Sequence, residues 1–256
     1  MTRLADYQDR FPDIRFRRED GILEMAIHRN GGTALWGFSQ GGIHEQLGDA
    51  FHAVGRDREN RVVILTGTGD VFLDSFDPAD FENPEPWDAA FLDRIYKEGK
   101  DLLTNLLDIE VPVIGAVNVA AHIHAELLLL SDIVVAAEEA TFADHAHAPG
   151  GVVPADGVHV IWTMLLGPNR ARYFLLTGEV IDAAEAKRLN FVAEVVPRAD
   201  LLPRAWELAR LLAKKPTQML RYSRVALTLD LKRRMLNDLG HGLLLEGAAI
   251  MGGTGW

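Results

Sequence analysis

The 256-residue sequence contains no cysteine, so it can form no disulfide and offers no thiol nucleophile. It is also poor in basic residues, because 26 Lys and Arg against 37 Asp and Glu give a formal net charge of -11. Nucleic acids and anionic membranes need a basic face on a protein partner, so neither is expected to bind. Long apolar runs are missing as well: runs such as Leu127 to Leu130 are far too short to cross a bilayer.

The N-terminal segment, MTRLADYQDRFPD, lacks the apolar centre of a secretory signal. Together with the missing membrane span, this predicts a soluble, cytoplasmic protein. Hydrophobic residues make up 48% of the chain, which is enough to build a sizeable core. A chain of this length fits one large α/β domain, or one domain with a smaller appendage.

The histidines are distributed unevenly. Five of the nine fall in one stretch, as two H-x-H pairs and a single downstream residue: His122, His124, His145, His147 and His159. Asp156 lies nine residues after His147 and is a candidate to orient an imidazole. Histidine is the side chain whose unperturbed pKa lies near neutrality, so the cluster predicts either proton-transfer chemistry or a metal site.

The hydrophobic pattern divides the chain into strands alternating with helices over 1–196 and a helical region over 197–256. Strands are predicted over 14–17, 22–27, 61–66, 111–117, 133–136 and 191–196. Helices are predicted over 41–55, 87–107, 126–131, 160–166, 170–176 and 183–189. From Asp200 onward the pattern is helical, with a break at Lys215-Pro216.

Four segments carry a family pattern, namely RENRVVILTGTGDVF, EVPVIGAVN, SDIVVAAEEATFAD and LLTGEVIDAAEAKRLNFVAEVV. Together they resemble the crotonase (enoyl-CoA hydratase/isomerase) superfamily over most of the chain. The resemblance implies an α/β fold in which ββα units wind into a spiral that forms the catalytic core over 1–196. It also implies that 197–256 is a C-terminal helical region that builds homotrimers, or hexamers made of two trimers.

Two turns depart from that family pattern. Members of the superfamily hold the oxygen of an acyl-CoA thioester with two backbone N–H groups, in turns that correspond to Leu73–Asp77 and His122–Ala125. Glycine and other small residues are usual there because the backbone must approach the ligand closely. Here bulky and ionisable side chains fill both turns, and histidine replaces the acid of the hydratases near the end of FADHAHAPGG. These departures argue against a backbone oxyanion hole and against acyl-CoA binding.

Three segments, EVPVIGAVN, HAPGGVVPADGVHVIW and RYFLLTG, resemble one branch of the superfamily, the 6-oxocamphor hydrolase-type β-diketone hydrolases. That branch cleaves carbon–carbon bonds without CoA or a metal, so no cofactor is expected. The resemblance places the catalytic side chains at His147, Asp156, His124 and His44, and the substrate-contacting ones at Trp36 and Glu246.

Hydrolysis of a β-diketone needs a base for water, a donor for the developing oxyanion and a proton source for the enolate that leaves. Histidine suits all three tasks near neutral pH. The expected roles are His147 as the base, with Asp156 fixing its tautomer, and His124 as a donor to a carbonyl oxygen. Trp36 is expected to supply a wall and an indole N–H. The expected partner is a small cyclic diketone.

Three other functions fit parts of the same pattern. A metal hydrolase could use His122, His124 and Glu126 as a ligand ladder, although side chains two residues apart diverge in the turn and helix start predicted there. A CoA-dependent hydratase or acyl-CoA hydrolase would follow the superfamily, and a non-catalytic trimeric scaffold would use the fold alone.

Single residues also have ordinary interpretations. Asp156 lies in Pro-Ala-Asp-Gly, a common turn sequence, and Glu246 could be a solvated helix residue. The histidines without a family counterpart, His122, His145 and His159, are expected to support the site or the fold. The loop from Asp77 to Pro86 is expected to shape specificity.

Overall fold

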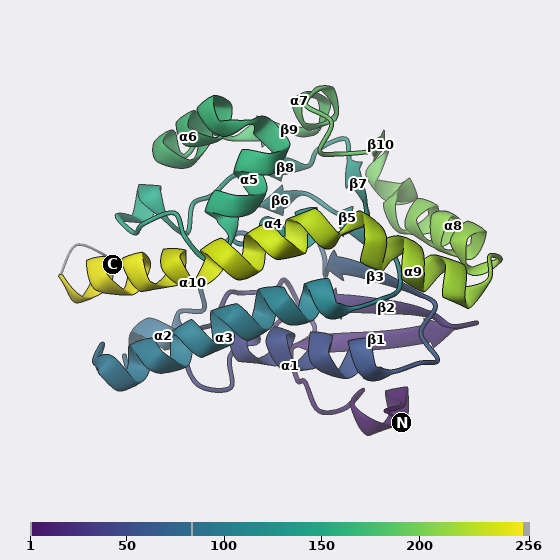
Figure 1. Ribbon diagram of the computed structural model, residues 1–256, viewed down its shortest axis with the longest axis horizontal. Helices are drawn as coiled ribbons and strands as arrows, with labels where there is room; N and C mark the ends of the chain where they lie inside the picture. Colours follow the sequence, from purple (N-terminus) through teal and green to yellow (C-terminus); the bar gives the residue numbers. More distant parts are fainter. Residues whose placement is uncertain (1, 83, 253–256) are drawn as a thin grey trace.

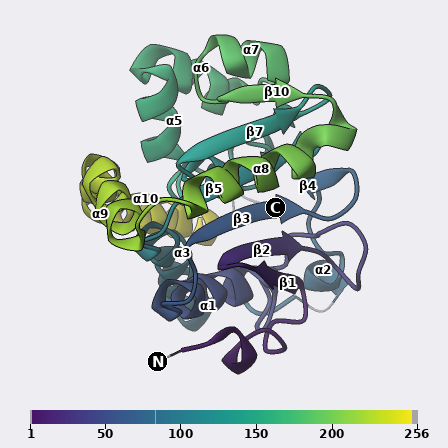
Figure 2. The same cartoon turned by 90° about the vertical axis from the view of Figure 1, so that its right-hand side faces the viewer.

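The computed structural model describes residues 2–82 and 84–252. Within these residues, ten strands form two sheets (Figures 1 and 2). The larger sheet has the order β1 (Ile14–Glu19), β2 (Ile22–Ile27), β3 (Val62–Gly67), β5 (Val113–Val117), β7 (Ile133–Ala137) and β10 (Glu194–Val196). The smaller sheet has the order β4 (Val71–Leu73), β6 (Ala120–Ala121), β8 (Thr141–Phe142) and β9 (Ile181–Asp182).

The helices follow the strands in a regular order. They are α1 (Ile43–Arg56), α2 (Ala79–Glu82), α3 (Ala89–Asp108), α4 (Glu126–Leu129), α5 (Val158–Leu166), α6 (Pro168–Thr177), α7 (Ala183–Arg188), α8 (Leu201–Ala213), α9 (Thr217–Leu227) and α10 (Leu229–Met251). Short 3₁₀ turns occur at Leu4–Asp6, Ala148–Gly150 and Arg198–Asp200. Asp88 begins α3, where its carboxylate accepts from the backbone N–H groups of Ala90 and Phe91.

Successive ββα units wind into a spiral. In each of the units that begin with β3, β5 and β7, the first strand joins the larger sheet and the second strand joins the smaller one. β2, β3, β5, β7 and β10 run parallel, as do β4, β6 and β8, whereas β1 pairs antiparallel with β2 and β9 with β8. The carboxyl ends of β4, β6 and β8 therefore meet at one edge of the smaller sheet.

Both faces of the larger sheet are buried, which explains its nearly continuous apolar strands. On β3, Val63 and Leu65 enter the main core, whereas Val62 and Ile64 enter a second cluster on the opposite face. That second face is covered by α8 through an apolar stripe of Leu201, Ala205, Trp206 and Ala209. Figure 2 shows α8 in front of the sheet, over β3, β5 and β7.

The C-terminal helices pack closely on the rest of the chain. α10 runs alongside α3 and contacts α5 (Figure 1). The strands end with β10 at Val196, but α8 completes the core of the sheet that precedes it. The division of the chain at 196/197 into a core and an oligomerisation region stays a prediction.

Most long elements lie where the sequence predicts them, including the break between α8 and α9 at Lys215-Pro216. Two predictions need correction. The strand predicted over 191–196 covers only Glu194–Val196, because Phe191 and Val192 are core side chains of the preceding turn. The four strands of the smaller sheet were not predicted, since two or three residues are too few to show an alternating pattern.

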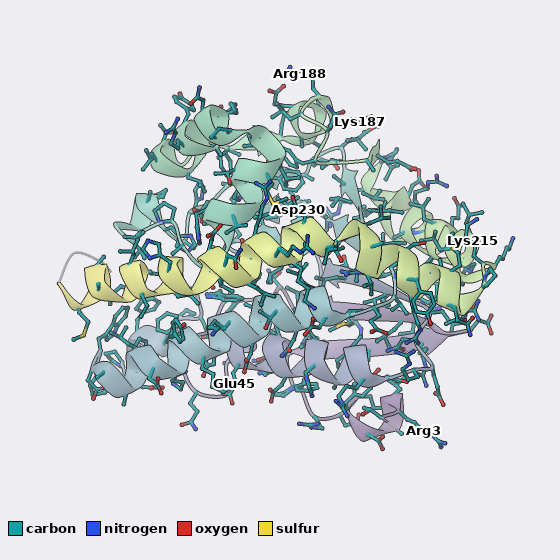
Figure 3. All side chains as sticks on the ribbon, viewed as in Figure 1. Arg3, Glu45, Lys187, Arg188, Lys215 and Asp230 are labelled. Atoms are coloured by element: carbon teal, nitrogen blue, oxygen red, sulfur yellow. The ribbon has the colours of Figure 1, made fainter. Side chains whose placement is uncertain are left out.

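No helix of the described ranges is long and apolar enough to span a membrane. Charged side chains such as Arg3, Lys187 and Lys215 lie at the periphery of the molecule (Figure 3).

Gly157, the residue after the predicted site residue Asp156, allows the start of α5 to pack closely against Leu103 of α3. Its φ is +82°, and a Cβ added there would lie 2.3 Å from Leu103 Cδ1. We expect Gly157→Ala to lower the free energy of unfolding by about 2–4 kcal/mol, through backbone strain and overpacking. Urea unfolding measures this difference. Gly150→Ala is the control, because its nearest neighbour would be His145 O at 3.9 Å and its effect should stay within about 0.5 kcal/mol. Equal losses in both variants would contradict this packing argument.

Candidate active site

The six predicted site residues lie around one cavity of about 60 Å³. They come from distant parts of the chain: Trp36, His44, His124, His147, Asp156 and Glu246. Four aromatic side chains, Phe38, Phe76, Trp87 and Phe91, form much of the remaining wall. A larger cavity of about 780 Å³, between α1, α3, α9 and α10, contains none of the six. Ligand pockets usually have roughly 300 Å³ or more, so this cavity must widen to admit a ring-shaped ligand.

Local backbone geometry brings these side chains together. His124 follows β6 with φ at 51°, and Asp156 precedes α5 with φ at 47°. A left-handed conformation costs a residue with a Cβ about 1–3 kcal/mol, and such strain concentrates at functional sites. The turn at His124 thus keeps a conformation that favours glycine, while carrying an imidazole that stacks on Trp36 with ring centroids 3.8 Å apart.

His147 is held by Asp144. Nδ1 of His147 lies 2.6 Å from Asp144 Oδ1, and both side chains are buried. This corrects the expectation that Asp156 fixes the tautomer of His147. The backbone bends at Ala146 and His147, so the acid three residues before His147 reaches its ring. Nδ1–H therefore donates to Asp144, and Nε2 is left for other partners.

His124 has its own acid. Nδ1 of His124 lies 2.5 Å from Glu126 Oε1 and 3.6 Å from Asp156 Oδ2. Burial favours the neutral ring, but Glu126 and Asp156 outweigh it and raise the pKa of His124. Asp156 fits between α3 and this ring because position 99 is glycine, where a Cβ would lie 2.9 Å from Asp156 Oδ1.

His44 shows the same arrangement a third time. Its Nδ1 lies 3.1 Å from Glu98 Oε2 on α3, and Arg94 binds that carboxylate at 3.0 Å. Burial of Glu98 favours its neutral form, but His44 and Arg94 outweigh it and lower the pKa of Glu98. Each of the three imidazoles thus presents Nδ1 to a carboxylate, which leaves its Nε2 free for other contacts.

Glu246 reaches the cavity from α10. Its Oε1 lies 3.9 Å from Nε2 of His147. Burial raises the pKa of Glu246 to about 7, although the charge of His147 opposes the shift. Burial favours neutral His147, but Asp144, Glu246 and Asp156 outweigh it and raise the pKa of His147 to about 10. At neutral pH the site therefore holds a His147 imidazolium beside a carboxyl group that is near its titration point.

The remaining histidines of the cluster lie outside the cavity. Nε2 of His159 lies 3.3 Å from Asp238 O, so this ring packs against α10. His122 and His145 lie beside Asp74. The proposed ladder of His122, His124 and Glu126 does not converge, because His122 contacts Asp74 and Thr141 while His124 contacts Glu126.

Sequence reasoning missed the three acids that hold the imidazoles. Asp144 and Glu126 lie three and two residues from their histidines, so local spacing could have suggested them. Glu98 lies 54 residues from His44 and belongs to another helix, so the linear pattern carries no signal for it.

The family is established by comparison with known proteins. A family model described as enoyl-CoA hydratase/isomerase matches residues 17–240. The probable peroxisomal enoyl-CoA hydratase 1 of Arabidopsis thaliana is 32% identical over 201 residues, 78% of this chain and 72% of that protein. The carnitinyl-CoA dehydratase of Citrobacter koseri is 34% identical over 199 residues, 77% of this chain and 73% of that protein. The chain belongs to the enoyl-CoA hydratase/isomerase family and is an enzyme of the crotonase superfamily.

Solved structures narrow the likeness. A β-diketone hydrolase from the cyanobacterium Anabaena sp., bound to (S)-3-oxocyclohexyl acetic acid, is 46% identical with a TM-score of 0.90, covering 95% of this chain and 96% of that one. An enoyl-CoA hydratase/isomerase from Mycobacterium paratuberculosis is 25% identical with a TM-score of 0.85, covering 93% of each chain. The predicted crotonase-like α/β fold and the resemblance to β-diketone hydrolases are confirmed.

We expect Asp144→Asn to lower the pKa of His147 from about 10 toward its ordinary value. The substitution removes the negative charge that contributes most to raising this pKa against the effect of burial. The pKa of His147 is raised from 6.5 to about 10 in the folded protein, so its pairing with Asp144 stabilises the fold fully below pH 6.5. This stabilisation is lost as the pH rises toward 10. The variant should lose about 2–4 kcal/mol of stability at neutral pH, because the stabilisation that comes with the raised pKa is lost at roughly 1.4 kcal/mol per pKa unit.

An NMR titration of the His147 ring measures the pKa, and Asp156→Asn is the matched control, with a smaller expected fall. If Asp156→Asn lowered the pKa of His147 more than Asp144→Asn does, Asp156 would be the main partner of His147, as the sequence predicts.

Proposed function

We propose that the protein hydrolyses a carbon–carbon bond of a cyclic β-diketone, in a retro-Claisen reaction that yields a keto acid. The observation that carries the proposal is the pairing of His124 and His147. Both imidazoles are backed by carboxylates, and their ring centroids are 5.9 Å apart beside an aromatic wall. This spacing suits two donors that each hold one carbonyl of a 1,3-dione. Similarity to the Anabaena β-diketone hydrolase, bound to an oxocyclohexyl acetic acid, supports the same substrate class.

In the proposed reaction, water adds to one carbonyl carbon and forms a tetrahedral oxyanion. The bond from that carbon to the carbon between the carbonyls then breaks, and its electron pair becomes the enolate of the second ketone. The proton taken from water is finally placed on the enolate carbon. One water is consumed and one keto acid is formed, so no oxidant, reductant or further reactant is needed.

The proposed roles follow from the charges. Glu246, with a pKa of about 7, takes the proton from water, because an effective base has a pKa near the working pH. His147, with a pKa of about 10, remains an imidazolium and donates Nε2–H to the attacked carbonyl. This replaces the base role predicted for His147.

His124 donates to the second carbonyl, where the enolate charge develops. Asp156 supports His124 electrostatically, and Trp36 fixes the plane of its ring. The ring centroids of His44 and Trp36 are 5.2 Å apart. His44 and Phe38 help to enclose the substrate.

We further propose a homotrimer, or a hexamer of two trimers, built through the C-terminal helices. Exposed apolar side chains on α9 and α10 support this assembly: Val225, Leu227, Leu236, Leu244 and Leu245. The cytoplasmic location stays a prediction.

The direct test is turnover of a panel of 2,2-disubstituted cyclic diones in ¹⁸O-labelled water. We expect a keto acid with one labelled carboxylate oxygen from at least one dione. His147→Ala should abolish turnover, whereas His52→Ala, at an exposed position of α1, should keep it. The proposal fails if the whole panel is inert, or if calorimetry shows saturable acyl-CoA binding in this cavity.

The pH dependence tests the assignment of the base. Glu246 must be ionised and His147 protonated, so kcat/KM should rise with pH through about 7 and fall through about 10. Glu246→Gln should lower kcat by about 10²–10⁴-fold and remove the rise near neutrality. An unchanged acidic limb in Glu246→Gln would return the base role to His147.

A further inference from the structure

Three polar side chains outside the catalytic cavity meet at the edge of the smaller sheet. Asp74 directly follows β4, His122 directly follows β6, and His145 lies three residues after the end of β8. These strands are parallel neighbours, and their last residues pair in register, Leu73 with Ala121 and Ala121 with Phe142. The topology of the sheet therefore delivers the three side chains to one place.

The side chains form a compact group. Nδ1 of His122 lies 2.6 Å from Asp74 Oδ1, and the rings of His122 and His145 have centroids 4.9 Å apart. One potential ligand atom from each residue lies within 4.8 Å of the other two. The backbone N–H of His145 donates to His122 O at 2.8 Å, which ties two of the turns together. Solvent reaches the group, since 42% of the Asp74 side chain is exposed.

We propose that Asp74, His122 and His145 bind a divalent transition-metal ion of the Zn²⁺ type. Two imidazoles and one carboxylate form a donor set that Zn²⁺ accepts, with water completing a tetrahedral site. Imidazole ligands favour Zn²⁺, Cu²⁺ and Ni²⁺ over Mg²⁺ and Ca²⁺. If Nδ1 of His122 binds the metal, its Nε2–H donates to Thr141 Oγ1, 2.8 Å away. Such a hydrogen bond fixes the tautomer and orientation of a metal-binding imidazole.

This site is separate from the proposed hydrolytic chemistry. None of its three residues lines the catalytic cavity, but each is followed two residues later by one that does: Phe76, His124 and His147. A bound ion would cross-link the three turns that carry these cavity residues. Because it binds the folded chain, it should also raise the melting temperature as its concentration increases.

The experiment titrates ZnCl₂ into chelator-treated, tag-free full-length protein, with calorimetry and thermal melting as readouts. We expect one saturable site per chain and a rise in Tm. His145→Ala and Asp74→Asn should each weaken binding at least about tenfold, because losing a ligand should cost no less than losing a hydrogen-bond partner of one. His52→Ala, which removes an exposed histidine elsewhere, and His147→Ala should leave Zn²⁺ affinity unchanged. Circular dichroism verifies that the variants are folded.

Substitution by Co²⁺ provides a second readout, because its visible absorption distinguishes a tetrahedral site from a hydrated ion. The proposal is overturned by lack of saturable binding, or by equal affinity in His145→Ala and Asp74→Asn. Loss of the site in His147→Ala with retention in His145→Ala would overturn it too, because the ion would then lie among the catalytic histidines.

Discussion

The site depends on one repeated interaction, a buried imidazole whose Nδ1 is held by a carboxylate. His44, His124 and His147 are each held in this way, by Glu98, Glu126 and Asp144. A buried polar group is costly unless it has a hydrogen-bond partner, so these acids make it possible to bury the three rings beside an aromatic wall. They also fix which ring nitrogen is left for a substrate. The helices and turns that carry these residues must keep their relative positions for the pairs to form.

The fold keeps these elements in place and still tolerates different side chains at the turn of His124. The turn at His124 keeps a left-handed backbone, as expected where glycine is usual in the family, yet it carries a side chain that fills the turn. The family resemblance implies donors from the backbone, and in our proposal imidazole rings supply them instead. A ring with an acid behind it can change its protonation state, whereas a backbone N–H cannot. In our proposal, the same scaffold thereby becomes suited to moving protons during carbon–carbon bond cleavage.

Sequence reasoning located the larger sheet and the long helices because their apolar runs and 3.6-residue spacing are clear. It also gathered all six residues around the cavity, through resemblance rather than spacing. It failed where only three-dimensional structure decides. β6 and β8 have only two residues each, and Glu98 is remote in sequence from His44. The carboxylate that contacts Nδ1 of His147 is that of Asp144 and not that of Asp156, because of the local path of the backbone. The pKa values that support Glu246 as the proposed base depend on burial, which the linear sequence does not contain.

In the proposed function, His124 and His147 hold the two carbonyl groups of a β-diketone in the aromatic cavity. The most direct measurement is a crystal structure of the protein with its keto acid product. We expect the ketone oxygen at hydrogen-bonding distance from His124 Nε2, and the new carboxylate beside His147 Nε2 and Glu246. A product bound in the larger cavity, or a product whose oxygens contact backbone N–H groups instead of these imidazoles, would contradict it.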